Sequence, residues 1–384
     1  MRKAPPPLAV LVLGGVADRW DSPPETPLCL ARKPNLDRLA SEGRVLGVRL
    51  VKDDREAMTA APLLSILGFD PAQVETACAS YLGALTDERL LAEECFVSAD
   101  FVALFRETVA DAEPGPFKPA ETEILLRAAD AAMRRAGFRL VAGSGAHHVA
   151  IATRAAVDPE VPPPVLLLGR GLADPGPRVA QHAFAHRLAR EALDRHEINE
   201  VRRDLGRNGA DAVWLWGPGG PALLAAHWDA PVSAAGADAV WRGVCKAARI
   251  PLRVSHARTP GGLAKGVAQA LRSDAICFVH APRGTHDALV RDPKLRANGI
   301  RDLDETVVAP LAKAVAAARA RLLVVADVAR DSATGVPCAD PVPALLWGEG
   351  IEALTHRPFT EAGARAAGDP LEPGHGLLAY VRHL

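Results

Sequence analysis

The chain has 384 residues, of which 49% are hydrophobic and 24% are charged, a balance that is ordinary for a soluble globular protein and leaves room for two domains. Its 45 basic and 46 acidic side chains give a net charge of −1, which excludes a general electrostatic attraction to nucleic acid or to an anionic membrane. The six cysteines show no C-x-x-C spacing, so we expect reduced thiols rather than a disulfide frame or a zinc site.

The first apolar run, Leu8–Leu13, is too short to span a membrane and is followed by Gly14-Gly15, which suits a junction between a strand and a loop. We therefore expect a buried strand rather than a signal peptide, and a cytoplasmic protein. Short apolar runs recur along the chain and are typical of buried strands in a mostly parallel sheet. These further runs are His148–Thr153, Val165–Leu168, Ala212–Trp216, Ala275–Val279, Leu322–Ala326 and Ala344–Trp347.

Amphipathic helical patterns lie between the apolar runs. They predict helices over Asn35–Glu42, Glu121–Ala136, Arg187–Leu205 and Asp304–Ala320. The first two patterns are followed or closed by glycine, as helix ends commonly are. The alternation of strand and helix signals predicts an α/β fold.

A stretch near the C-terminus carries the strongest chemical signal. An apolar run ends at Asp327-Val328, and a loop containing Pro337 then leads to Asp340-Pro341-Val342-Pro343. Earlier in the chain, Leu64–Pro71 reads Leu-Ser-Ile-Leu-Gly-Phe-Asp-Pro, and Val12–Arg19 reads Val-Leu-Gly-Gly-Val-Ala-Asp-Arg. The helical stretch Lys33–Gly43 reads Lys-Pro-Asn-Leu-Asp-Arg-Leu-Ala-Ser-Glu-Gly.

Taken in order, these stretches resemble the archaeal-type, cofactor-independent phosphoglycerate mutases of the alkaline phosphatase superfamily. The resemblance covers nearly the whole chain. It implies a three-layer α/β sandwich with a mostly parallel central sheet and an inserted smaller α/β domain. Residues 1–75 and 205–384 would form the phosphatase-like core, and residues 76–204 would form the insert.

The resemblance also implies a centre of two divalent metals, but most of its ligand positions are occupied by other residue types. Gly14, Val328 and Pro337 stand where the family has an Asp and two His, and these residues offer no side-chain lone pair to a metal. Arg283 stands at a further Asp position. His286 and Asp327 are the remaining ligands of the original set.

The residues that would perform the chemistry are changed as well. Thr59 stands where the family has its serine nucleophile, and it would need a metal or a base to be activated. The more ordinary role for Thr59 is that of a loop residue or a helix cap. Asp327 in turn could act as a cap or pair with Arg283.

Four residues are candidates for binding a substrate or an anion. Arg283 could take over the charge of a lost metal and bind an anion directly. His147 and His148 occupy a family substrate segment, although alternation along a strand sends one of the two to each face. Lys265 follows Gly261-Gly262 and could meet a phosphate near a helix N-terminus.

Three functional hypotheses follow from these residues. The leading one is a catalytically inactive binding or regulatory homologue that needs no cofactor. Such a homologue would keep a cleft for a small anionic or phosphorylated ligand. A homo-oligomer or a complex with a protein partner is a further expectation. The second is a phosphoglycerate mutase or related phosphotransfer enzyme that uses Thr59 with Mn, Zn or Mg. The third is a metal-free lyase or isomerase that uses His286 or His147.

Overall fold

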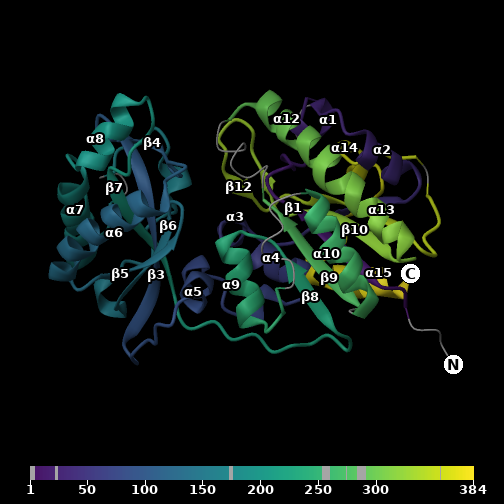
Figure 1. Cartoon of the computed structure of the whole chain (residues 1–384), viewed down its shortest axis with the longest axis horizontal. Coiled ribbons are helices and arrows are strands. Elements are labelled where there is room, and N and C mark those ends of the chain that lie inside the picture. Colours follow the sequence, from purple (N-terminus) through teal and green to yellow (C-terminus); the bar gives the residue numbers. More distant parts are fainter. Residues whose placement is uncertain are drawn as a thin grey trace. The chain divides into compact units, whose positions relative to one another are not determined.

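The computed structural model describes residues 5–21, 25–172, 176–252, 260–273, 275–282, 291–354 and 356–384. The chain folds into two compact units (Figure 1). The first unit combines Met1–Val74 with Leu224–Leu384, and the second is the continuous segment Glu75–Leu223. No helix in the described ranges is both long enough and apolar enough to cross a bilayer.

A six-stranded sheet forms the centre of the first unit. In spatial order its strands are β2 (Arg44–Val48), β13 (Val342–Gly348), β10 (Arg321–Ala326), β1 (Leu8–Leu13), β9 (Ile276–Ala281) and β8 (Val232–Ala235). The strands from β10 to β8 are parallel, whereas at one edge β13 pairs antiparallel with β10, and β2 pairs antiparallel with β13. Every residue of β1, β9 and β10 is buried, which explains why these strands read as continuous apolar runs. The expected mostly parallel central sheet is therefore confirmed.

Helices surround this sheet. Helix α10 packs against β9, β1 and β8, whereas α13 packs against β10, and α14 packs against β2 and β13. The helices in the described part of the unit are α1 (Pro27–Leu30), α2 (Pro34–Ser41), α3 (Asp54–Ala57), α4 (Ala61–Ile66), α9 (Ala239–Ala247), α10 (Pro260–Ser273), α12 (Pro293–Leu303), α13 (Ala309–Ala317), α14 (Glu361–Arg365) and α15 (Leu377–His383). A π-helical turn, η5 (Asp304–Val308), joins α12 to α13, and 3-10 turns lie at η1 (Pro71–Gln73) and η6 (Gly374–Gly376). A small hairpin of β11 (Ala329–Arg330) and β12 (Pro337–Cys338) follows β10.

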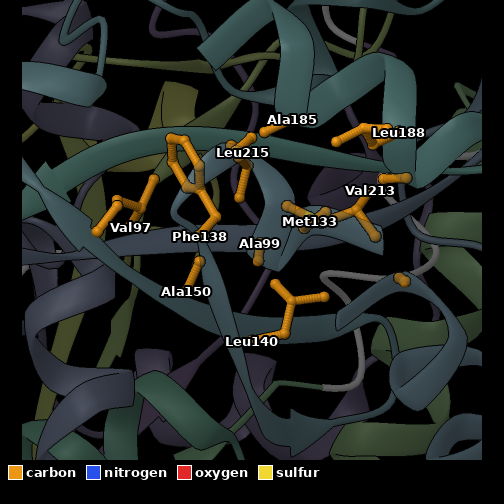
Figure 2. Packing of buried hydrophobic residues seen from close by; sticks show 14 of the residues in the cluster. Val97, Ala99, Met133, Phe138, Leu140, Ala150, Ala185, Leu188, Val213 and Leu215 are labelled. Atoms are coloured by element: carbon orange, nitrogen blue, oxygen red, sulfur yellow. The ribbon is translucent and has the colours of Figure 1, made fainter. Parts of the chain in front are cut away.

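The second unit is built on an antiparallel sheet. The strands are β4 (Thr108–Asp111), β3 (Glu94–Phe105), β6 (His147–Thr153) and β5 (Arg139–Ser144), and β7 (Ala212–Gly219) pairs with the other side of β3. Its helices are α5 (Cys78–Ala84), α6 (Pro119–Met133), α7 (Ala180–Leu193) and α8 (Glu197–Asp204), with 3-10 turns η2 (Arg134–Ala136), η3 (Arg154–Ala156) and η4 (Pro164–Leu167). Alternate residues of β3, β6 and β7 pack against α6 and α7 in one apolar cluster (Figure 2).

The structure differs from the sequence-based expectations at the end of the insert. The segment Ala212–Trp216 was expected in the core sheet after a return at residue 205, but it forms β7 and pairs antiparallel with β3 of the second unit. The apolar run Val165–Leu168, which the sequence predicts as a strand, falls largely within the 3-10 turn η4 instead. The sequence predicts one long helix over Arg187–Leu205, but the structure has two. Helix α7 ends at Leu193, and α8 begins after His196, whose side chain accepts a hydrogen bond from the Ile198 N–H.

Candidate functional site

The candidate site lies at the carboxyl ends of the parallel strands β1, β9 and β10, where α/β sheets commonly carry functional groups. The backbone ladder continues for one residue beyond the strands. The Gly14 N–H donates to the Ala281 carbonyl at 2.9 Å, and the Asp327 N–H donates to the Leu13 carbonyl at 3.0 Å. Gly14 and Asp327 therefore follow directly on two neighbouring strands of the sheet.

Asp327 holds the backbone of this edge together. Its side chain is buried, and one carboxylate oxygen accepts hydrogen bonds from the N–H groups of Gly15 at 3.0 Å and Val328 at 2.7 Å. Asp327 thus acts as a cap that ties the loop after β1 to the end of β10. The alternative partner considered from the sequence, Arg283, lies outside the described residues, as does His286.

A buried arginine from α12 supplies positive charge at the same edge. Arg296 is fully buried, and its guanidinium donates to the carbonyls of Gly15 at 3.1 Å, Ala17 at 2.8 Å and Arg330 at 3.2 Å. It also donates to the Ser332 hydroxyl at 2.7 Å. One side chain therefore links the loop after β1 to the loop after β10.

Two buried carboxylates balance this cation. Asp18 lies 3.8 Å from the Arg296 guanidinium and accepts hydrogen bonds from the Ser332 backbone and hydroxyl. Glu361 accepts from the Asp18 N–H at 2.8 Å and from the Thr26 hydroxyl at 2.7 Å. Burial raises the pKa of Glu361 despite these bonds, and burial lowers the pKa of Arg296 although the charge of Asp18 opposes that change.

The described residues do not fit a two-metal centre of the family type. Gly14 has no side chain, Val328 is buried and apolar, and Pro337 lies in β12, where it pairs with Arg330 of β11. Throughout the ranges given above, no three His, Cys, Asp or Glu side chains are grouped so that they could hold a metal ion. The buried positive charge that the described part of this edge contains is the guanidinium of Arg296, which has no lone pair to give to a metal.

Thr59 is engaged in local backbone bonds. Its half-buried hydroxyl donates to the Glu56 carbonyl at 2.8 Å and accepts from the Ala61 N–H at 3.1 Å. Thr59 precedes the N-cap residue of α4, Ala60, and its bond to Ala61 satisfies the first N–H of that helix. The hydroxyl proton is directed at a carbonyl and not at a base that could activate the oxygen.

A cavity of about 550 Å³ lies beside the Asp18 network. Four carboxylates line it, from Asp18, Asp21, Glu25 and Asp331, against the single guanidinium of Arg19. Arg19 in turn lies 3.6 Å from Asp331. This excess of negative charge opposes the binding of a phosphorylated ligand, so the cavity is not the predicted anion site.

The two histidines predicted to bind a substrate belong to β6 of the second unit and lie on opposite faces of its sheet. His148 is fully buried against Phe101 and accepts a hydrogen bond from the Gly143 N–H at 3.0 Å. Burial lowers the pKa of His148 to about 3, so this imidazole is neutral at physiological pH. It is a core residue and is not placed to contact a ligand.

His147 is the more accessible of the pair, with 40% of its side chain exposed. Its Nδ1 lies 2.9 Å from the Asp100 carboxylate, and its Nε2 lies 3.3 Å from the Glu113 carboxylate. Asp100 also accepts a hydrogen bond from the Trp216 indole. Desolvation lowers the pKa of His147, but the charges and hydrogen bonds of Asp100 and Glu113 together raise it by more, so the pKa lies well above its ordinary value.

Lys265, the last of the predicted binding residues, is exposed in the second turn of α10. Thus Asp327 is the one predicted site residue that the described structure places at the carboxyl edge with a defined set of partners. The sequence reasoning missed Arg296 and the role of Asp18. Asp18 was visible within the motif Val12–Arg19, whereas Arg296 lies in the unpredicted helix α12 and had no signal of its own.

No family model matches the chain. It is 27% identical to the 2,3-bisphosphoglycerate-independent phosphoglycerate mutase 2 of Methanothermobacter thermautotrophicus, an alignment that covers 93% of this chain and 92% of that protein. It is 26% identical to the corresponding mutase of Methanothrix thermoacetophila, over 97% of this chain and 98% of the relative. The chain is therefore similar over nearly its whole length to archaeal cofactor-independent phosphoglycerate mutases, as the sequence motifs suggested.

Solved structures show the same fold. A protein from Pyrococcus horikoshii superposes with a TM-score of 0.69 at 20% identity, covering 99% of this chain and 97% of that one. A cofactor-independent phosphoglycerate mutase from Thermoplasma acidophilum superposes with a TM-score of 0.54 at 20% identity, covering 98% and 99% of the two chains. The chain thus shares the fold of these two proteins, with the expected mixed α/β architecture.

Proposed function

We propose that this phosphoglycerate-mutase-like chain binds a small anionic or phosphorylated ligand without a two-metal centre, as a binding or regulatory homologue of the mutases. The observation that supports this most directly is the pairing of Asp327 with backbone N–H groups beside the buried guanidinium of Arg296. The side chains that would hold metals are replaced by Gly14 and Val328, while the surrounding strands and turns are kept.

The electrostatics of the edge favour this proposal. Arg296 stays protonated at any physiological pH, so its charge is permanent. A divalent cation bound next to Asp327 would add a second positive charge to the same buried region, where charges are poorly screened. It would also compete for the carboxylate oxygen that now accepts from Gly15 and Val328. Asp18 and Glu361 already balance the charge of Arg296, so this guanidinium disfavours a metal at Asp327 but does not by itself attract an anion.

Metal analysis of the purified full-length protein tests the proposal. We expect substoichiometric Mn²⁺, Zn²⁺ and Mg²⁺ after dialysis, together with measurable binding of 3-phosphoglycerate or inorganic phosphate by calorimetry. Chelator should leave that binding unchanged. Two tightly held divalent cations per chain would overturn the proposal.

The named homologues favour a second candidate, phosphoglycerate mutase activity itself. On this hypothesis Thr59 would replace the serine nucleophile, and a rearranged or single metal would activate it. An enolase-coupled assay with added Mn²⁺ tests it directly. Turnover that disappears in Thr59→Ala would establish the candidate, whereas turnover that is equal in both proteins would rule out Thr59.

A further inference from the structure

One buried histidine near the carboxyl edge of the first unit has no hydrogen-bond partner. His280 of β9 is 7% exposed, and neither Nδ1 nor Nε2 is hydrogen bonded within the described residues. An imidazole must carry a proton on at least one nitrogen, so a donor and an acceptor are both left unsatisfied. Such a group costs stability, and its presence in a folded protein requires an explanation.

The strand register places His280 toward the candidate site. His280 is paired in register with Val12 of β1, and Val12 is paired with Val325 of β10. Side chains in register on parallel strands share a face, and the next residues on that face are two positions further on. Those residues are Gly14 and Asp327. His280 therefore lies on the same face of the sheet as Gly14 and Asp327, at the level of the residues two positions before them. Gly14 has no side chain, so β1 leaves space on this face at the carboxyl edge.

The ring of His280 is held in position. Its centroid lies 5.3 Å from that of Trp241, with an angle of 32° between the planes. Trp241 is itself fixed, because its indole N–H donates to the Ala235 carbonyl at 3.0 Å. Gly236 provides the necessary room, since a Cβ atom there would lie 2.7 Å from Trp241 and 3.2 Å from the Cβ of His280. The imidazole is thus positioned by its neighbours while its polar atoms remain unpaired.

We infer that His280 is a ligand-contacting residue, which donates an imidazole N–H to an oxygen of a phosphate or carboxylate group bound at the carboxyl edge. This inference rests on the anion binding proposed above. Both nitrogens are closed to solvent in the present conformation, so the contact requires a local rearrangement of the edge as the ligand enters. Residues kept for a ligand commonly reduce stability in its absence.

The test is the variant His280→Phe, which keeps a ring of similar size against Trp241 and removes both nitrogens. Replacing an unpaired polar group by an apolar one of the same shape is neutral or stabilising. We therefore expect an unchanged or higher midpoint of thermal unfolding, together with at least tenfold weaker binding of 3-phosphoglycerate in calorimetry. His280→Gln, which keeps an N–H donor, should recover part of the affinity.

His148→Phe is the matched control for stability. His148 is also buried and contacts the ring of Phe101 edge-on, but it accepts the Gly143 N–H, so its replacement should lower the midpoint. Wild-type affinity in His280→Phe would overturn the inference while leaving the proposed function intact. A midpoint of thermal unfolding that falls in His280→Phe as much as in His148→Phe would also overturn the inference, because it would show that the His280 nitrogens stabilise the protein without a ligand. If the wild-type protein binds neither 3-phosphoglycerate nor phosphate, both proposals fail.

Discussion

The charged groups at the carboxyl edge of the first unit and those around His147 in the second unit have different kinds of hydrogen-bond partner. At the carboxyl edge, Asp327 and Arg296 bond mainly to backbone N–H and carbonyl groups. In the second unit, Asp100 and His147 bond to each other through their side chains, with Glu113 on the far side of the imidazole. The bonds at the carboxyl edge hold the loops after β1 and β10 in place, whereas the carboxylates of the second unit keep the His147 imidazole protonated.

This difference shows which region is sensitive to which change. Backbone groups do not titrate in the physiological range, so the first network depends on the presence of its side chains and little on pH. The imidazole of the second network titrates near neutrality unless its neighbours shift it. Substitutions should therefore affect the first region most, and pH should affect the second.

The largest effect is expected for Arg296→Met. The change removes the cation that faces Asp18 and leaves the carbonyls of Gly15 and Ala17 without a donor. Breaking a buried charge network in this way costs about 3–5 kcal/mol of the free energy of unfolding. Chemical denaturation measures it, with Arg301→Met on the same helix as the control, since Arg301 is half exposed. A loss no larger than that of the control would show that Arg296 does not hold the edge.

Asp327→Ala should have the next largest effect. It leaves the N–H groups of Gly15 and Val328 unpaired in a buried place, at a cost of roughly 2–3 kcal/mol. Asp327→Asn keeps an acceptor oxygen and should cost less, so the two variants separate the hydrogen bonds from the charge. Denaturation curves for both proteins give the comparison. If Asn is as damaging as Ala, the charge and not the backbone bonding is what matters.

A smaller effect is expected for Thr59→Ala. Loss of the hydroxyl removes the acceptor for the Ala61 N–H and should cost about 1 kcal/mol, as for other caps. Thr59→Ser keeps the hydroxyl and is the matched control, with a midpoint close to that of the wild type. An unchanged unfolding midpoint in the alanine variant would argue against the capping role.

The subtlest prediction concerns pH and the second unit. The pKa of His147 is raised in the folded state, so its contribution to stability is fully present below its unfolded pKa of about 6.5 and is lost as pH rises through the folded value. For His148 the sign is opposite: its folded pKa of about 3 means that stability falls as pH drops from about 6.5 toward 3. NMR titration of the two imidazoles should show these opposite shifts, and His147→Gln should flatten the decline on the alkaline side. A His147 pKa at or below 6.5 would contradict the described network.

The general architecture follows from the sequence because its strands are buried on both faces and read as short apolar runs. The sheet order and the limits of the insert do not. Ala212–Trp216 has the same apolar character whichever sheet it joins, so its pairing with β3 is decided by tertiary contacts. The interruption between α7 and α8 at Asp194–His196 depends on a capping hydrogen bond from the His196 side chain. The sequence pattern does not show this bond, because both helices have the same amphipathic character.

The candidate site was predictable in part. The motif positions identified Asp327 and the residues that replace metal ligands, because these depend on residue type alone. Arg296 was not identifiable, since an arginine in a polar helix ordinarily faces solvent and only the fold shows that this one is enclosed. His280 likewise looks like an ordinary residue at the end of an apolar run until the register of β9 and β1 is known.

The pairing of β7 with β3 determines how the chain can be divided. A fragment that stopped at residue 204 would lack β7 and would leave one side of β3 with a row of unpaired backbone N–H and carbonyl groups. Open strands of that kind recruit other chains and promote aggregation. The segment Glu75–Leu223 retains β7, and both of its ends connect to the first unit, so it is the natural unit for excision or for transfer into another protein.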